Sequence, residues 1–170
     1  LQLVALVPLE YWGSSEGQSF GVRVAQFSGL LGGVLAPPFD KAVTRDSLVE
    51  MFNLANKLGC AIDLHIDESD RYPAEGLKLL IEVLDQHQVD VPITCSHLTS
   101  MSLLSQRNLR RLADRLAHHR VSVVVLPLTN FWLLGRHGRR TPIERPFAPI
   151  MELQEAGVIV GVGGDNVQDP

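Results

Sequence analysis

Residues 61–68 read AIDLHIDE, an apolar run that ends in imidazole and carboxylate side chains. Five further apolar runs of similar length lie at residues 2–7, 30–36, 91–95, 121–126 and 158–162. Several are rich in valine and isoleucine and do not alternate with polar residues, which is typical of strands buried on both faces of a parallel sheet. The runs therefore predict six strands of such a sheet.

Apolar residues at helical spacing separate these runs. The patterns cover residues 48–58 with Thr44 as N-cap, residues 77–84 with Pro73 in the first turn, residues 109–116, residues 150–156 stopped by Gly157, and, more weakly, residues 17–29. The strand ends follow one another at intervals of 29, 30, 29, 31 and 36 residues. Such a repeat of strand and helix predicts an α/β fold with an all-parallel sheet.

Two architectures fit a repeated βα unit, a (β/α)8 barrel and an open doubly wound sheet. Neither GxGxxG nor GxxxxGK[ST] follows any of the runs, so the nucleotide-binding open folds lose support. No linker or low-complexity segment divides the chain, and we expect residues 1–170 to form a single domain.

Composition excludes several classes of protein. With 170 residues, 45% of them hydrophobic, the chain can bury a core, and it is neither disordered nor collagen-like. A net charge of −4 argues against nucleic-acid binding, and no apolar run approaches the roughly 20 residues of a membrane helix. Cys60 and Cys95 lie in apolar runs, so we expect buried free thiols and a cytoplasmic location.

Histidines and acids cluster where the predicted strands end. His65 lies at the end of the third run, His97 follows the fourth and Asp165 follows the sixth. Parallel strands end at one edge of the sheet, and in barrels that edge carries the chemistry. A single histidine is as well explained by burial or exposure with a hydrogen bond, but three such groups at one edge favour a divalent metal site.

Two further features have alternative explanations. Glu68 follows His65 by three residues and could shuttle protons at the metal site, or it could be a surface carboxylate in the acidic stretch 67–70. The basic segment 136–140 could bind an anionic substrate, or it could be a solvated loop that pairs with Glu144. The remaining histidines fall away from the strand ends and are expected on the surface: His87, His118, His119 and His137.

Several short segments together resemble a known family. They are residues 64–68 (LHIDE), 96–97 (SH), 127–130 (PLTN), 134–136 (LGR), 141–143 (TPI) and 157–170 (GVIVGVGGDNVQDP). In this order they are similar to the metal-dependent amidohydrolase superfamily, in the branch of bacterial cytosine deaminase and related triazine hydrolases. The resemblance spans essentially the whole chain. It implies a TIM-type (β/α)8 barrel, present here as an incomplete barrel of about six βα units.

The resemblance also implies roles for individual residues. His65 and Asp165 match metal ligands, and the cofactor would be one divalent ion, zinc or iron. Glu68 matches the proton shuttle, His97 the group that polarises the attacking water, and Asp165 also takes a proton from that water. Glu68 and Asn166 would contact the substrate. The implied enzyme hydrolyses a C–N bond of a small nitrogen heterocycle, such as a pyrimidine, triazine or cyclic ureide, through a metal-activated hydroxide.

The chain departs from the family pattern at three places. It contains no His-x-His motif, which supplies the other two ligands on the first strand of the family's barrel, so we expect these residues alone to be inactive. Leu9-Glu10 follows Pro8 where a cytosine-recognising glutamine is expected, and Asn166 replaces a second aspartate. The missing motif would also fit a non-catalytic scaffold or small-molecule-binding barrel. A homo-oligomer is compatible with either function.

Overall fold

The computed structural model describes residues 2–135 and 146–167. It contains six strands: β1 (Val4–Val7), β2 (Leu30–Leu35), β3 (Ile62–Ile66), β4 (Ile93–His97), β5 (Ser122–Val125) and β6 (Val160–Val162). The six predicted strands are confirmed, each with both ends within two residues of the apolar run.

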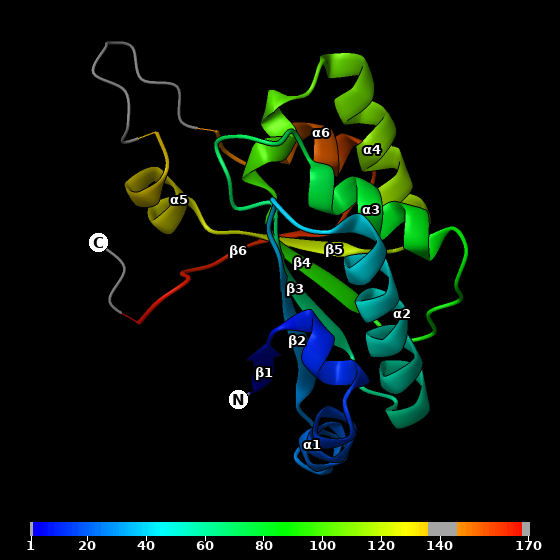
Figure 1. The fold of residues 1–170 in the computed structure, drawn as a ribbon. Helices are drawn as coiled ribbons and strands as arrows, with labels where there is room; N and C mark the ends of the chain where they lie inside the picture. Colours follow the sequence, from blue (N-terminus) through cyan, green and yellow to red (C-terminus); the bar gives the residue numbers. More distant parts are fainter. Residues whose placement is uncertain (1, 136–145, 168–170) are drawn as a thin grey trace.

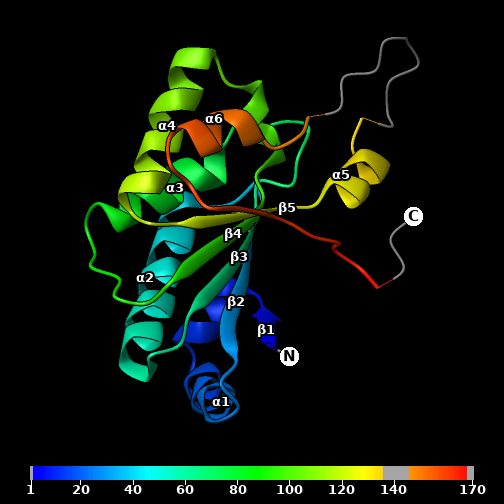
Figure 2. The same cartoon turned by 180° about the vertical axis from the view of Figure 1, so that it is seen from behind.

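The strands form one sheet in the order β1-β2-β3-β4-β5-β6, and every neighbouring pair is parallel. A doubly wound sheet reverses its strand order at a switch point, whereas a barrel keeps chain order throughout. The observed order is therefore that of a barrel wall. Figures 1 and 2 show α2, α3 and α4 together on one face of this curved sheet, while α5 stands apart near the ends of β5 and β6.

The helical segments are η1 (Leu9–Gly13), α1 (Ser15–Gln26), α2 (Lys41–Leu58), α3 (Glu75–Leu84), η2 (Thr99–Leu103), α4 (Gln106–His118), α5 (Pro127–Leu133) and α6 (Ile150–Glu155). All five predicted helices are present, and the positive φ of 89° at Gly157 confirms the expected stop of α6. The two 3₁₀ turns and α5 were not predicted, because segments this short carry no apolar stripe.

The predicted start of α2 was wrong. Asp40, and not Thr44, is the N-cap, and its carboxylate accepts hydrogen bonds from the backbone N–H groups of Ala42 and Val43. Thr44 lies inside the first turn and is buried. Aspartate caps a helix at least as well as threonine, so the earlier of the two capping residues begins the helix.

The start of α3 also differs from the prediction. Pro73 precedes the N-cap, Ala74, and does not lie in the first turn. Alanine has no capping side chain, and the carboxylate of Asp67 takes over this task from the preceding loop. It accepts hydrogen bonds from the N–H groups of Gly76 at 2.9 Å and Leu77 at 2.8 Å.

One apolar cluster fills the space between the sheet and the helices that cover it. Ile62, Leu64 and Ile66 of β3 are fully buried on this side, as are Leu48 and Met51 of α2. On the opposite face, the side chains of Val4, Leu6 and Val34 are 41–48% exposed. Burial on both faces is therefore confirmed for most positions of β2 and β4, whereas the second face of the edge strand β1 is only partly covered among the described residues.

Cys60 and Cys95 are buried free thiols, as predicted. Among residues 2–135 and 146–167, no helix combines the length and the apolar character needed to cross a membrane.

Candidate active site

The predicted site residues His65, His97 and Asp165 converge at the carboxyl edge of the sheet. Nδ1 of His65 lies 3.2 Å from Nε2 of His97, and that same Nε2 lies 4.0 Å from Oδ1 of Asp165. The nitrogen and oxygen atoms that these three side chains offer all lie within 4.8 Å of one another. Residues far apart in the chain thus meet where the strand ends predicted them to meet.

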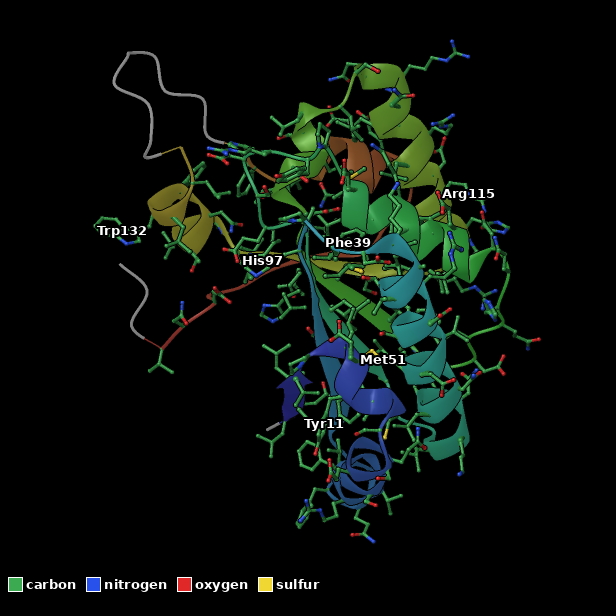
Figure 3. All side chains as sticks on the ribbon, in the orientation of Figure 1. Tyr11, Phe39, Met51, His97, Arg115 and Trp132 are labelled. Carbon is green, nitrogen blue, oxygen red and sulfur yellow. The ribbon has the colours of Figure 1, made fainter. Side chains whose placement is uncertain are left out.

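The backbone at the end of β4 explains how His97 reaches this position. The register pairs His65 with Ser96 and Ile66 with His97, so regular alternation would turn His97 towards the helix-covered face, away from His65. His97 and Leu98 instead have positive φ angles, 74° and 50°, and the strand ends in this left-handed turn. Figure 3 shows His97 at the edge where the strands end. Such a conformation costs a residue other than glycine about 1–2 kcal/mol, which the surrounding contacts must offset.

The three side chains fit a divalent ion. Nitrogen ligands at about 2.0–2.1 Å from a tetrahedral ion lie about 3.3 Å apart, close to the separation of the two histidine nitrogens. Two imidazoles and a carboxylate are ligands that suit a borderline ion such as zinc or iron. The same separation also suits a hydrogen bond between the two rings, so distance alone does not distinguish the two arrangements.

Glu68 lies beside this cluster with an unusual pKa. Its Oε1 is 3.5 Å from Nδ1 of His97 and accepts a hydrogen bond of 3.2 Å from Asn130. Burial, followed by the charge of Asp165, raises the pKa of Glu68 to about 7, and the Asn130 hydrogen bond opposes the rise. A carboxyl group with a pKa near neutrality can both accept and release a proton at pH 7.

His97 shows the opposite shift. Burial, followed by the charge of His65, lowers the pKa of His97 to about 4. Its ring is therefore neutral at pH 7, with one nitrogen that carries a hydrogen and one that carries a lone pair.

Comparisons with known proteins agree with this geometry. A model of the amidohydrolase family matches residues 13–170. The chain belongs to the amidohydrolase family. A pterin deaminase from Rhizobium rhizogenes is 32% identical over 171 residues, which cover 100% of this chain and 38% of that protein.

Two solved structures share the fold of this amidohydrolase chain. The 5-methylcytosine deaminase from Klebsiella pneumoniae, liganded with 5-fluorocytosine, has a TM-score of 0.79 at 24% identity and covers 100% of this chain and 41% of its own. N-isopropylammelide isopropylaminohydrolase from Burkholderia multivorans has a TM-score of 0.67 at 21% identity, and the match covers 99% of this chain and 40% of that one. The chain thus spans about two fifths of these relatives, and its α/β fold is an incomplete (β/α)8 barrel of six strands.

Asp67 is a site residue that the sequence did not reveal. In the sequence it belongs to an acidic stretch that suggests a surface position, yet its side chain is fully buried. Burial raises the pKa of Asp67 to about 6, and the hydrogen bonds that it accepts from α3 oppose this rise. Its backbone oxygen accepts from Thr99 Oγ1 at 2.9 Å and from the N–H of Ser100 at 3.2 Å, and its own N–H donates to Leu35. Asp67 therefore ties β2, α3 and η2 to the loop between His65 and Glu68.

Asn130 is the second residue that was missed, although it lies in the segment that follows the fifth run. It is 1% exposed, and its Nδ2 lies 3.2 Å from Glu68 Oε1 and 3.1 Å from His97 Nδ1. The signal was available, because Asn130 is a polar residue shortly after a strand end. Asp63 is the third residue that was missed. It is a carboxylate inside an apolar run, and its Oδ1 lies 3.9 Å from Nε2 of His65.

The other predicted residues lie outside this cluster. Asn166 follows Asp165 and is exposed. His87 and His118 are exposed as predicted, whereas His119 is partly buried and contacts Asp85 at 2.7 Å. Residues 136–140, including His137, and Glu144 lie outside the described residues.

Proposed function

We propose that the protein containing this chain hydrolyses a C–N bond of a small nitrogen heterocycle and releases an amine or ammonia. The observation that carries this proposal is the contact between Glu68, a carboxyl group with a pKa of about 7, and the cluster of His65, His97 and Asp165. The names of the relatives support it, since pterin deaminase, 5-methylcytosine deaminase and isopropylammelide isopropylaminohydrolase all denote removal of an amino or alkylamino group.

His65 and Asp165 would hold a divalent ion, zinc or iron. When bound, such an ion lowers the pKa of water and so supplies a nucleophile at neutral pH. The absence of a His-x-His motif from these residues means that further ligands would come from outside them.

The chain's own residues would move the protons. Glu68 accepts one proton from the attacking water and returns it to the departing nitrogen, while the carboxylate of Asp165 can take the second. The C–O bond forms and the C–N bond breaks, so that one proton of the water leaves with the amine and the second ends on a ring nitrogen of the product, whose new oxygen becomes a carbonyl. General acid–base catalysis of this kind contributes about 10²–10⁴ in rate. His97 lies between the two carboxylates and can orient the water.

The substrate would be a small ring that carries an amino or alkylamino group. Aminopyrimidines, amino- or alkylaminotriazines and pterins fit this description, whereas hydrolysis of a C–N bond in a cyclic ureide would open the ring. Leu9-Glu10 replaces the glutamine expected for cytosine recognition, and Asn166 replaces an aspartate at the rim, so these positions favour a ring other than cytosine.

Metal analysis of the full-length protein, combined with a screen for released ammonia, released amine or ring-opened product over these four ring classes, tests the proposal. We expect about one divalent ion per chain and turnover of at least one class. His65→Gln should lose the ion, while the control variant His87→Gln, at an exposed histidine, should keep it. A protein that holds no ion would contradict the proposal and favour a non-catalytic barrel scaffold.

A further inference from the structure

We propose that Thr99 is a positioning residue that holds the backbone on both sides of Glu68 and so keeps its carboxyl group beside His97. This inference deepens the proposed function and rests on it for its effect on turnover. The hydrogen bonds that carry it belong to the fold, and they can be measured without a substrate.

The hydroxyl group of Thr99 contacts the backbone of both neighbours of Glu68. It accepts a hydrogen bond of 3.0 Å from the N–H of Ser69, and it can donate to O of Asp67 at 2.9 Å or to O of Ser69 at 3.1 Å. The direction of these bonds is fixed, because a backbone N–H only donates and a carbonyl oxygen only accepts. Thr99 is fully buried, so water does not compete for them.

Glu68 is the middle residue of a tight turn. The N–H of Ser69 also donates to O of Asp67 at 2.9 Å, which closes a three-residue turn around Glu68. The same oxygen of Asp67 accepts a third hydrogen bond, of 3.2 Å, from the N–H of Ser100. The backbone that enters and leaves Glu68 is therefore bonded to a single element, η2.

The piece of chain that holds this turn also carries His97. His97 is the last residue of β4, and Thr99 begins η2 directly after Leu98, whose N–H donates to O of Ile66 at 3.0 Å. Oε1 of Glu68 lies 3.5 Å from Nδ1 of His97. Thr99 thus fixes the turn of Glu68 to the same short segment as the imidazole. This matters for a proton shuttle, because a displacement of about 1 Å from the reacting atoms can cost about 10²-fold in rate.

Ser100 provides a matched comparison within η2. Its side chain is also fully buried, and its hydroxyl accepts from the N–H of Ala74 at 3.0 Å and donates to O of Tyr72 at 3.2 Å. Both hydroxyl groups therefore bond to backbone N–H and C=O groups of the same loop. They differ in place, because Thr99 binds on either side of Glu68 and Ser100 binds further along the loop. A role in stability alone predicts similar effects from both, whereas positioning of Glu68 predicts an effect on the chemical step from Thr99 alone.

Kinetics of the full-length protein separate these two roles. Thr99→Val, which replaces the hydroxyl by a methyl group of similar size, should lower kcat by about 10- to 100-fold and change KM by less than about threefold. Thr99→Ser keeps the hydroxyl and should restore kcat to within about threefold of the unmodified protein. Ser100→Ala should lose as much stability in urea unfolding as Thr99→Val and keep its kcat. Equal losses of kcat in Thr99→Val and Ser100→Ala would overturn the inference.

The same substitution in a Glu68→Gln background tests whether Thr99 acts through Glu68. Residues that act as a unit have non-additive effects, so we expect Thr99→Val to lower the remaining rate of Glu68→Gln by less than about threefold. A loss in this background as large as in the unmodified protein would mean that Thr99 affects turnover by another route, and it would contradict the inference.

Hydrogen exchange tests the contact without turnover and covers the case in which Thr99→Val does not fold. In the unmodified full-length protein, corrected for intrinsic rates, the amide of Ser69 should exchange at least about tenfold more slowly than that of Arg71, whose N–H makes an exposed hydrogen bond to the Ser69 hydroxyl. Thr99→Val should remove this protection, whereas Ser100→Ala should keep it. Exchange at Ser69 as fast as at Arg71 would overturn the inference. The expected protection in a protein without turnover would count against the proposed function alone.

Discussion

Replacing Asp67 by alanine should destabilise the fold about three times as much as the same change at Asp40. The two aspartates make the same pair of contacts, since each accepts hydrogen bonds from the second and third N–H groups of a helix, α3 for Asp67 and α2 for Asp40. They differ in environment, because Asp67 is fully buried and Asp40 is exposed. The comparison therefore sets a buried helix cap against an exposed one, and Asp67 differs also in its positive φ of 54°, against −76° at Asp40.

The expected magnitudes follow from what replaces the lost contacts. In Asp40→Ala, water can reach the two freed N–H groups, so the loss should be that of an ordinary cap, about 1 kcal/mol. In Asp67→Ala, two buried N–H groups lose their partner at about 1–3 kcal/mol each. Burial already disfavours the Asp67 carboxylate, as its pKa of about 6 shows, so the lower part of this range applies. The loss should be about 3 kcal/mol.

Urea unfolding of both variants at pH 7 gives the free energies of unfolding and their m-values. We expect unchanged m-values and a difference between the two losses of about 2 kcal/mol. Asp67→Asn, which keeps one acceptor oxygen, should fall between Asp67→Ala and the unmodified protein. A loss for Asp67→Ala no larger than that for Asp40→Ala would refute the role given to the buried cap.

Three further predictions concern packing, metal and pH. Gly76→Ala should lower the free energy of unfolding by about 1–3 kcal/mol in urea, because an added Cβ would lie 2.9 Å from Asp67 Oδ1 and Leu35 O. The control Gly13→Ala should be near neutral, because its Cβ would meet only Glu50, at 3.5 Å. Treatment of the full-length protein with a chelator should lower its melting temperature, and His65→Gln should abolish this effect, since an ion bound only by the folded state stabilises it; an equal shift in His65→Gln would contradict the metal site. The value of kcat/KM should rise with pH through about 7 as Glu68 loses its proton and becomes a base. A pH profile of kcat/KM that shows no such rise would exclude Glu68 as that base.

The meeting of His65, His97 and Asp165 could be predicted from the sequence because it depends only on strand direction. Parallel strands end at one edge, so polar residues that follow successive apolar runs must gather there. The face of the sheet on which the His97 side chain lies was not predictable. Regular alternation places it on the helix-covered face, and only the left-handed backbone at His97 turns it towards His65.

Asp67 and Asn130 escaped prediction for a different reason. Asp67 looked like a surface acid because the pattern does not show that α3 lacks a capping side chain of its own and takes one from a preceding loop. Asn130 contacts Glu68 across 62 residues of chain, from a helix too short to carry a periodic signal. Both roles depend on where loops return to the sheet, which local spacing does not encode.

Glu68→Gln in the full-length protein tests the central claim most directly. The glutamine keeps the size of the side chain and removes its ability to exchange a proton, while His65 and Asp165 are untouched. We expect ammonia release on the best ring substrate to fall by at least about 100-fold, with the metal content equal to that of the unmodified protein. Turnover close to that of the unmodified protein, with the ion still bound, would contradict the account.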